Sequence, residues 1–145
     1  MHVAMLIGSL SKGGTERILV NLVDFLLKRG HQVTVVTQYA KVNEYELNRS
    51  AKRVISDITE AETGHGRLTN FYRRFRKLRS IWRAEKPDVI LSFIGKNNLM
   101  ALLTTRRLSI PVAVAVRGAP EAEYPTGGLR RAASFLYRYA EGVVM

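Results

Sequence analysis

The sequence predicts an α/β domain with a Rossmann-like, doubly wound parallel sheet that carries helices on both faces. Two observations support this fold class. Short, continuous apolar runs alternate with segments of helical periodicity along the whole chain of 145 residues. No internal repeat, low-complexity segment or interdomain linker interrupts the alternation, and the length fits one domain. We therefore expect a single domain over residues 1–145, with right-handed crossovers and, by analogy with this fold, the strand order 3-2-1-4-5-6.

The first strand and the first helix have the clearest signals. Residues 3–8 form a continuous apolar run that ends at a glycine, which is typical of a buried strand. A helix is predicted over residues 15–29, with Thr15 as its N-cap and Gly30 just past its end, where a left-handed residue is common. Its polar side chains are expected to form one narrow solvent stripe, namely Arg17, Asn21, Asp24 and Lys28.

The remaining elements continue the alternation. β-branched residues predict a second strand at 33–37, and a weaker third strand at 53–58 follows a polar stretch without a clear period. A basic helix is predicted over residues 68–85. The pattern is completed by strands at 88–93, 111–116 and 142–145 and by helices at 97–107 and 128–139. The last strand looks incomplete, so we expect this chain to be one piece of a longer architecture.

Composition excludes several classes of protein. Without cysteine there are no disulfides, no thiolate nucleophile and no zinc ribbon. No apolar run approaches the ~18 residues that span a bilayer, and the apolar N-terminus lacks the basic start of a secretory signal. We therefore expect a cytoplasmic protein.

The charge is strongly basic and unevenly distributed. The net charge is +11, of which residues 1–60 contribute +2 and residues 61–145 contribute +9. Such asymmetry suggests an anionic partner, which can be nucleic acid, anionic lipid or a phosphorylated substrate.

The first turn of the predicted sheet is rich in glycine but matches no common nucleotide motif. It is not G-x-G-x-x-G, and Gly14 stands where a P-loop has its lysine, which argues against an ATPase. The Gly13-Gly14 pair before a helix can let a ligand approach the backbone and its free N–H groups, or can merely form a tight turn. In the first case Gly14→Val should abolish turnover without unfolding the domain, because a β-branched side chain fills the ligand space and resists a positive φ.

This turn also carries a family resemblance. The segments S-L-S-K-G-G-T-E-R-I-L-V-N-L at residues 9–22 and K-R-G-H-Q-V-T-V-V-T at residues 28–37 resemble the opening of family 4 glycosyltransferases. Their N-terminal domains begin with a strand, a G-G-x-E-R loop and a G-H-x-V-T second strand. The resemblance continues through K-P-D-V-I at residues 86–90 to the end of the chain.

The resemblance implies one half of a GT-B architecture, in which two Rossmann-like domains enclose the active site. The N-terminal domain mainly holds the acceptor, and the missing C-terminal domain holds the nucleotide-sugar, usually through an E-x7-E motif that has no counterpart here. The implied enzyme is a retaining hexosyltransferase that acts on a lipid-linked or polysaccharide-precursor acceptor. It needs no metal and no cofactor besides the nucleotide-sugar co-substrate. Alone, this chain is expected to be catalytically incomplete, and no catalytic residue is assigned.

The basic helix combines a cationic face with an aromatic one. Its apolar side chains fall within an arc of about 120°; they are Leu68, Phe71, Tyr72, Phe75, Leu78 and Trp82. We expect this face to be buried against the sheet. The opposite face is either merely solvated or contacts anionic lipid or a lipid-diphosphate acceptor through Arg73, Arg74, Arg76 and Lys77. The second reading implies a peripheral position at the inner face of the membrane. The hypothesis of nucleic-acid binding rests on charge alone, so nucleic acid is not expected to be a partner.

Two further residues are candidates for substrate binding, together with Gly13 and Gly14. Arg117 follows the fifth strand and can hold a phosphate or pair with Glu121 or Glu123. Asn97 can bind acceptor hydroxyls or cap its helix, and the cap is favoured.

A small acidic cluster has no partner histidine, so no metal site is expected; it consists of Asp57, Glu60 and Glu62. The rival function is a stand-alone, non-catalytic Rossmann-like module that binds an anionic membrane or partner.

Overall fold

A computed structural model describes residues 1–56, 67–116, 124 and 126–144. These residues form a six-stranded sheet in the order β3-β2-β1-β4-β5-β6, and every neighbouring pair is parallel. The fold class and the strand order expected from the sequence are thus confirmed. The strands are β1 (His2–Ile7), β2 (Gln32–Thr37), β3 (Lys52–Ile55), β4 (Val89–Phe93), β5 (Val112–Ala115) and β6 (Gly142–Val144).

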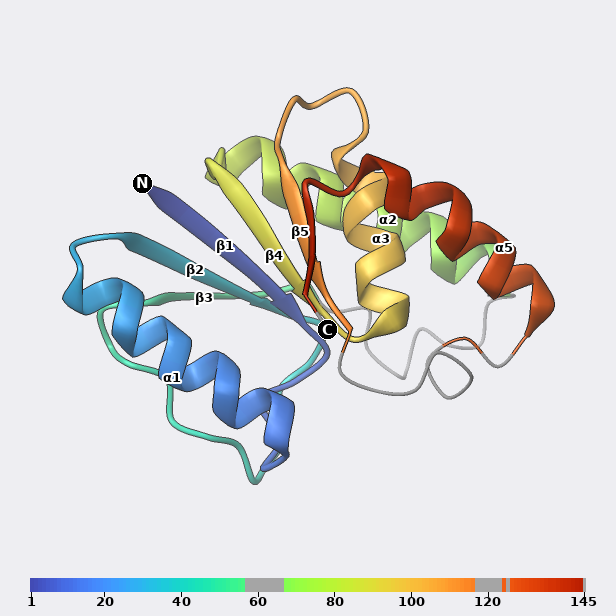
Figure 1. The fold of residues 1–145 in the computed structure, drawn as a ribbon. Helices are drawn as coiled ribbons and strands as arrows, with labels where there is room; N and C mark the ends of the chain where they lie inside the picture. Colours follow the sequence, from blue (N-terminus) through green and yellow to red (C-terminus); the bar gives the residue numbers. More distant parts are fainter. Residues whose placement is uncertain (57–66, 117–123, 125, 145) are drawn as a thin grey trace.

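Helices cover both faces of the sheet, as the crossovers of a parallel sheet require. Helix α1 (Gly14–Lys28) lies on one face, and α2 (Arg67–Glu85), α3 (Gly95–Thr105) and α5 (Gly127–Leu136) lie on the other (Figure 1). A single 3₁₀ turn, η2 (Tyr137–Tyr139), follows α5.

The core is divided between the two faces because side chains alternate along each strand. In β1, Met5 and Ile7 pack with Leu19 and Val23 of α1. The intervening Leu6 joins the cluster formed with α2, α3 and α5. That second cluster holds the side chains of Trp82 and Leu78, together with apolar residues of α3.

The start of α1 differs from the sequence prediction, whereas its end does not. The N-cap is Gly13 rather than Thr15, and no side chain caps the helix. Gly30 follows the last turn at φ 80°, which is the left-handed conformation predicted for it. The solvent stripe is wider than predicted, because Ile18 and Phe25 are exposed beside the polar residues.

The aromatic face of α2 is only half buried, which corrects the expectation from its periodicity. Trp82 and Leu78 are buried, but Leu68, Phe71 and Tyr72 are 86%, 47% and 59% exposed. Arg74 already stands level with the carboxyl edge of the sheet, beside Gly8 and Asn97. The exposed side chains of this face thus all lie in the turns of α2 that precede Arg74.

Arg79 faces the core side of α2 and binds the end of the neighbouring helix. Its Nη1 donates to the carbonyl oxygens of Thr104 and Arg106 at 3.0 and 2.8 Å. Carbonyl groups in the last turn of a helix lack partners within the helix, and a cation there also complements the helix dipole. Arg79 is thus a structural residue that joins α2 to α3.

Among the described helices, none is both long enough and apolar enough to cross a bilayer.

Candidate functional site

A hollow of about 480 Å³ lies at the carboxyl edge of the sheet, where ligands of open α/β sheets bind. It is built from the turns that follow β1, β2 and β4, from the first turns of α1 and α3, and from one side chain of α2. Its lining residues are Gly8, Ser9, Ser11, Glu16, Gln38, Tyr39, Lys41, Arg74, Ile94, Lys96 and Asn97.

Three cations from three separate segments line the hollow: Lys41 after β2, Arg74 in α2 and Lys96 at the start of α3. None of them pairs with a carboxylate in the described part of the chain, where the ion pairs are Lys52–Glu85 and Arg53–Glu44. Burial lowers the pKa of the Arg74 guanidinium, and the nearby Tyr39 opposes that effect. Unpaired cations in a partly desolvated hollow attract a multivalent anion.

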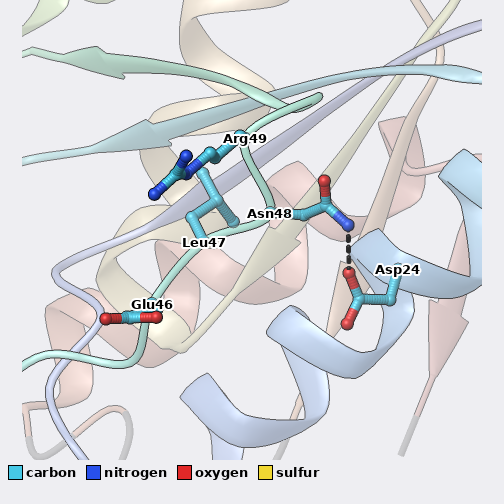
Figure 2. A pocket seen from close by; sticks show the side chains of 5 residues that line it. All are labelled: Asp24, Glu46, Leu47, Asn48 and Arg49. Atoms are coloured by element: carbon cyan, nitrogen blue, oxygen red, sulfur yellow. Dashed lines mark hydrogen bonds between the residues drawn. The ribbon is translucent and has the colours of Figure 1, made fainter.

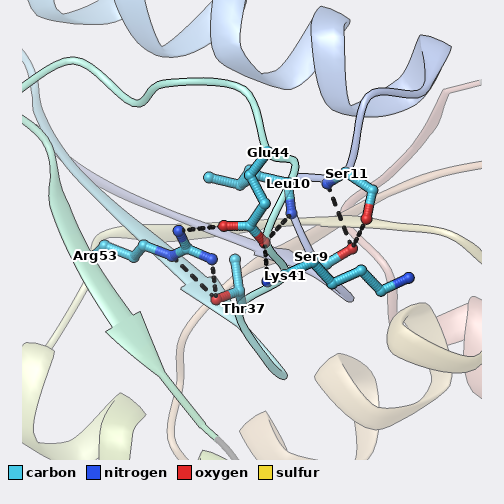
Figure 3. Close-up of polar contacts among 7 residues, drawn as sticks. All are labelled: Ser9, Leu10, Ser11, Thr37, Lys41, Glu44 and Arg53. Atoms are coloured by element: carbon cyan, nitrogen blue, oxygen red, sulfur yellow. Dashed lines mark hydrogen bonds and ion pairs between the residues drawn. The ribbon is translucent and has the colours of Figure 1, made fainter.

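A buried carboxylate ties the walls of the hollow together (Figure 3). Glu44 accepts hydrogen bonds from the backbone N–H groups of Leu10 and Lys41 and forms a 2.7 Å ion pair with Arg53. Arg53 in turn donates to the hydroxyl of Thr37, the last residue of β2. Glu44 thereby connects the turn after β1 with the segment between β2 and β3, so that both walls are held in place before any ligand arrives.

The charge of Glu44 makes the stability of this region dependent on pH. Burial alone would raise the pKa of this carboxyl, but the hydrogen bonds from Arg53, Lys41 and Leu10 and the charge of Arg53 outweigh it, so the pKa lies below its ordinary 4.5. A depressed pKa in the folded state stabilises the fold above pH 4.5, and this stability is lost as the pH falls through the folded-state value.

We therefore expect Glu44→Gln to lower the free energy of unfolding by about 1–2 kcal/mol at pH 7 and by much less at pH 3. Urea unfolding at a series of pH values measures this. Glu46→Gln is the matched control, because Glu46 is an exposed neighbour that the Glu44 network does not use. If the free energy of unfolding of Glu44→Gln changed with pH in parallel with that of the parent, Glu44 would not be the source of the pH dependence.

Asn97 lines the hollow, but the helix cap suggested for it is not formed. The N-cap of α3 is Ile94, and Asn97 lies inside the helix. Its Oδ1 accepts from Gln38 Nε2 at 2.8 Å, and its Nδ2 donates to the carbonyl of Phe93 at 3.3 Å. With both ends of its amide engaged and only 6% of its surface exposed, Asn97 braces the ends of β2 and β4 against each other.

The two candidate glycines lie next to the hollow rather than in its lining. Neither Gly13 nor Gly14 has a positive φ, so the prediction of a left-handed conformation at Gly14 is wrong. A Cβ added at Gly14 would also meet nothing within 4 Å. A Cβ at Gly13 would instead lie 2.4 Å from Oε2 of Glu16. The G-x-x-E spacing thus has a local explanation, since Gly13 leaves the space into which the Glu16 carboxylate folds.

The other sequence candidates are placed in different ways. Of the four cations proposed to face an anion, Arg74 alone lines the hollow, and Arg76 stacks 5.9 Å above the ring of Tyr72. Arg117 and the acidic cluster at 57–62 lie outside the described residues. Sequence reasoning missed Tyr39, Lys41 and Lys96, although their positions just after predicted strands were a usable signal.

A second hollow, of about 490 Å³, lies away from the carboxyl edge, beside the second half of α1 (Figure 2). Its lining mixes both charges, with Asp24, Glu46 and Arg49, and Asn48 donates to Asp24 at 2.8 Å. The described residues contain no cluster of histidine, aspartate and glutamate that could hold a metal ion. Because the second hollow carries acidic side chains beside its arginine, the first hollow is the better candidate for an anionic ligand.

Comparison with known proteins places this geometry in context. Residues 13–145 match the family model of the glycosyl transferase 4-like domain. One curated relative is a Campylobacter jejuni GalNAc-alpha-(1->4)-GalNAc-alpha-(1->3)-diNAcBac-PP-undecaprenol alpha-1,4-N-acetyl-D-galactosaminyltransferase, 26% identical over 114 residues. The match covers 79% of this chain and 32% of the relative, so the chain spans about a third of that protein's length.

Solved structures share the fold at low sequence identity. Sucrose-phosphate synthase from Thermosynechococcus elongatus superposes with a TM-score of 0.72 at 12% identity, covering 98% of this chain and 41% of that one. Anabaena HepE in complex with UDP-glucose gives 0.72 at 16% identity, covering 99% and 36%. MurG from Acinetobacter baumannii gives 0.64 at 18% identity, covering 98% and 40%. These likenesses concern the fold alone.

Proposed function

Because the chain belongs to the glycosyl transferase 4-like domain family, we propose that it is the acceptor-side domain of a glycosyltransferase. The whole enzyme moves a sugar from a nucleotide-sugar donor to a lipid-linked or polysaccharide-precursor acceptor. The observation that carries this proposal is the convergence on the hollow of three cations that have no carboxylate partner among the described residues. The relative from Campylobacter jejuni supports it, since its name describes an acceptor joined to undecaprenol through a diphosphate.

In this proposal the cations bind the phosphate groups of the acceptor. Arg74 is suited to a two-pronged contact with phosphate, and Lys41 and Lys96 supply point charges from the other walls. The hydroxyls of Ser9 and Ser11 bond to each other at 2.7 Å, so the one that accepts this bond keeps its own O–H as a donor at the same rim. Because the Glu44 network holds these walls together before binding, little of the binding energy is spent on ordering them.

Of the remaining substrate-binding candidates, Gly13, Gly14 and Arg117 keep their roles in the proposal, whereas Asn97, with both ends of its amide engaged, becomes a positioning residue. Gly13 and Gly14 present the N-terminus of α1, whose free N–H groups and dipole favour a negative charge. Arg117 provides a further phosphate contact, and Asn97 positions the floor. The C-terminal domain supplies the nucleotide-sugar, without a metal or another cofactor, and charge on the leaving group is stabilised by protein groups and dipoles.

The direct test is acceptor binding by this chain. A farnesyl-diphosphate-linked N-acetylhexosamine should bind measurably in calorimetry, whereas the same sugar joined to farnesol without the diphosphate should bind far more weakly. Equal affinity for the two ligands would refute the phosphate assignment. Adding a C-terminal donor domain and a UDP-sugar should then produce turnover that neither half shows alone.

A specific observation also favours contact with a membrane. The first turns of α2 expose Leu68, Phe71 and Tyr72 next to a cluster of cations. Apolar and aromatic side chains beside lysine and arginine are typical of helices that lie in the interface of an anionic membrane. We propose that this part of α2 faces the membrane, which places the protein at its inner surface and within reach of a lipid-linked acceptor. The same surface would serve the rival function, a non-catalytic membrane-binding module.

Binding to anionic vesicles is expected to depend strongly on salt and to be lost in the fourfold variant Arg73→Ala, Arg74→Ala, Arg76→Ala, Lys77→Ala. Each cation contributes roughly 1 kcal/mol near such a surface, screened over about 8–10 Å at physiological salt. Trp82 emission should not change on binding, because its side chain is fully buried. Vesicle sedimentation measures this, and unchanged binding of the variant would remove the membrane assignment. A Phe71→Ser, Tyr72→Ser variant tests insertion of the exposed rings, whose contribution should persist at high salt.

A further inference from the structure

The backbone of Ile94 is in an unusual conformation at the floor of the hollow. Its φ is 73° and its ψ is 131°, a region that glycine adopts readily and that a β-branched residue avoids. Lys86, Arg107 and Ser109, the other non-glycine residues with positive φ in the described part of the chain, are unbranched at Cβ. Ile94 therefore carries a conformational cost that a glycine at the same place would not have.

The backbone contacts of Ile94 do not require its side chain. Its carbonyl oxygen accepts from the N–H groups of Asn97 and Asn98 at the start of α3, and a glycine carbonyl would do the same. The side chain is 39% exposed and lines the hollow, so a substantial part of it is accessible to a ligand there. Backbone outliers of this kind cluster at functional sites, which makes Ile94 a candidate for a ligand contact.

Glu16 is a second residue of the hollow, and its charge in the first turn of α1 complements the helix dipole without occupying the hydrogen-bonding capacity of its carboxylate. Its carboxylate folds over Gly13 and lines the hollow together with the cations. It nevertheless forms no ion pair or hydrogen bond with any described side chain. An accepting group that stays unpaired beside cations is available to donors on a ligand.

We propose that Ile94 and Glu16 form a sugar-binding subsite beside the cations of the hollow. A sugar ring presents apolar C–H groups on its faces and hydroxyl donors around its edge. Ile94 packs against such a face, and Glu16 accepts hydrogen bonds from the hydroxyls of the acceptor's sugar. This proposal rests on the proposed function and deepens it. The cations bind the diphosphate, and Ile94 and Glu16 bind the sugar attached to it.

The test separates the two parts of the ligand by using two probes. One is methyl N-acetyl-α-D-galactosaminide, which is uncharged, and the other is inorganic pyrophosphate, which has no sugar. NMR of the protein with labelled isoleucine δ1-methyl groups follows both titrations, and the signal that disappears in Ile94→Val identifies Ile94. We expect the glycoside to shift this signal in a saturable way.

The variants are compared with the parent by isothermal titration calorimetry, because the two Ile94 variants lack the Ile94 signal, and they are expected to respond in distinct ways. Glu16→Gln should weaken glycoside binding roughly tenfold, because hydrogen bonds to a charged acceptor are lost. Ile94→Gly should also weaken it, by roughly fivefold, while leaving pyrophosphate affinity unchanged and the melting temperature equal or higher. Ile94→Val, the matched control, keeps the β-branched contact and should bind the glycoside within about twofold of the parent.

The outcomes distinguish this subsite from the proposed function. If pyrophosphate binds but the glycoside does not, or if the variants bind the glycoside like the parent, the subsite is refuted and the phosphate assignment stands. If glycoside binding depends on Ile94 and Glu16 while pyrophosphate fails to bind, the subsite stands and the phosphate assignment falls. If neither probe binds, both fall. A melting temperature several degrees lower in Ile94→Gly would show that the side chain supports the fold and would overturn the argument from strain.

Discussion

Replacing Trp82 with alanine is expected to lower the free energy of unfolding by about 4 kcal/mol, the cost of removing a large aromatic side chain from a packed core. Trp82 is fully buried between α2, α3 and the sheet, and its Nε1 donates to Oγ1 of Thr104 at 2.8 Å. Domains of this size have total stabilities of about 5–15 kcal/mol. The variant should therefore unfold at far lower urea concentration, with a slope similar to that of the parent.

Two controls locate the origin of this loss. Trp82→Phe keeps most of the packing and loses the hydrogen bond, so about 1–2 kcal/mol is expected. Tyr72→Ala removes an aromatic side chain from the exposed half of the same helix and should change stability by less than about 0.5 kcal/mol. Similar losses in Trp82→Ala and Tyr72→Ala would contradict the division of α2 into a buried and an exposed half.

Arg74→Ala is expected to weaken pyrophosphate binding by roughly 10- to 100-fold, which corresponds to the loss of a charge-assisted contact in a partly desolvated site. Arg74 is the one residue of α2 that lines the hollow, and it stands opposite Lys41 and Lys96. Because burial lowers the pKa of its guanidinium, its charge is poorly solvated in the free protein and gains most from an anionic partner. Isothermal titration calorimetry at fixed ionic strength measures the change.

The matched control is Arg83→Ala, which removes the same charge from an exposed position in the last turn of the same helix. It should leave pyrophosphate affinity within about twofold of the parent, since long-range attraction between exposed charges is screened. If the two variants lose affinity equally, the anion binds through the general basic charge of the chain, and the hollow is not its site.

Helix α2 thus serves three purposes along its length. Its last turns bury Leu78 and Trp82, its middle places Arg74 in the hollow, and its first turns expose Phe71 and Tyr72. In the proposed enzyme the first turns of α2 would contact the membrane, and Arg74 would contact the phosphate groups of the lipid-linked acceptor, next to the subsite proposed for its sugar. Pyrophosphate binding by Arg74→Ala tests the middle of the helix, and vesicle binding by the Phe71→Ser, Tyr72→Ser variant tests its exposed first turns independently.

The sequence by itself determined the elements and the sheet. Apolar runs, helical periods and Gly30 depend on contacts within a few residues, so they can be recognised without the tertiary structure. The strand order was predicted by analogy with the doubly wound fold, and the structure confirms it. The G-G-x-E-R motif at the first turn pointed to the family, and residues 13–145 match its model.

Only the tertiary structure decided which side chains meet. The helical period of α2 identified its apolar face but not how far the helix overlaps the sheet, and so the exposure of Leu68, Phe71 and Tyr72 was missed. Four neighbouring cations of α2 looked equivalent, yet Arg74 alone turns into the hollow. Lys41 and Lys96 join it from segments far apart in the chain, because parallel strands bring their carboxyl ends to one edge. Such convergence depends on the placement of whole elements, which a local pattern does not encode.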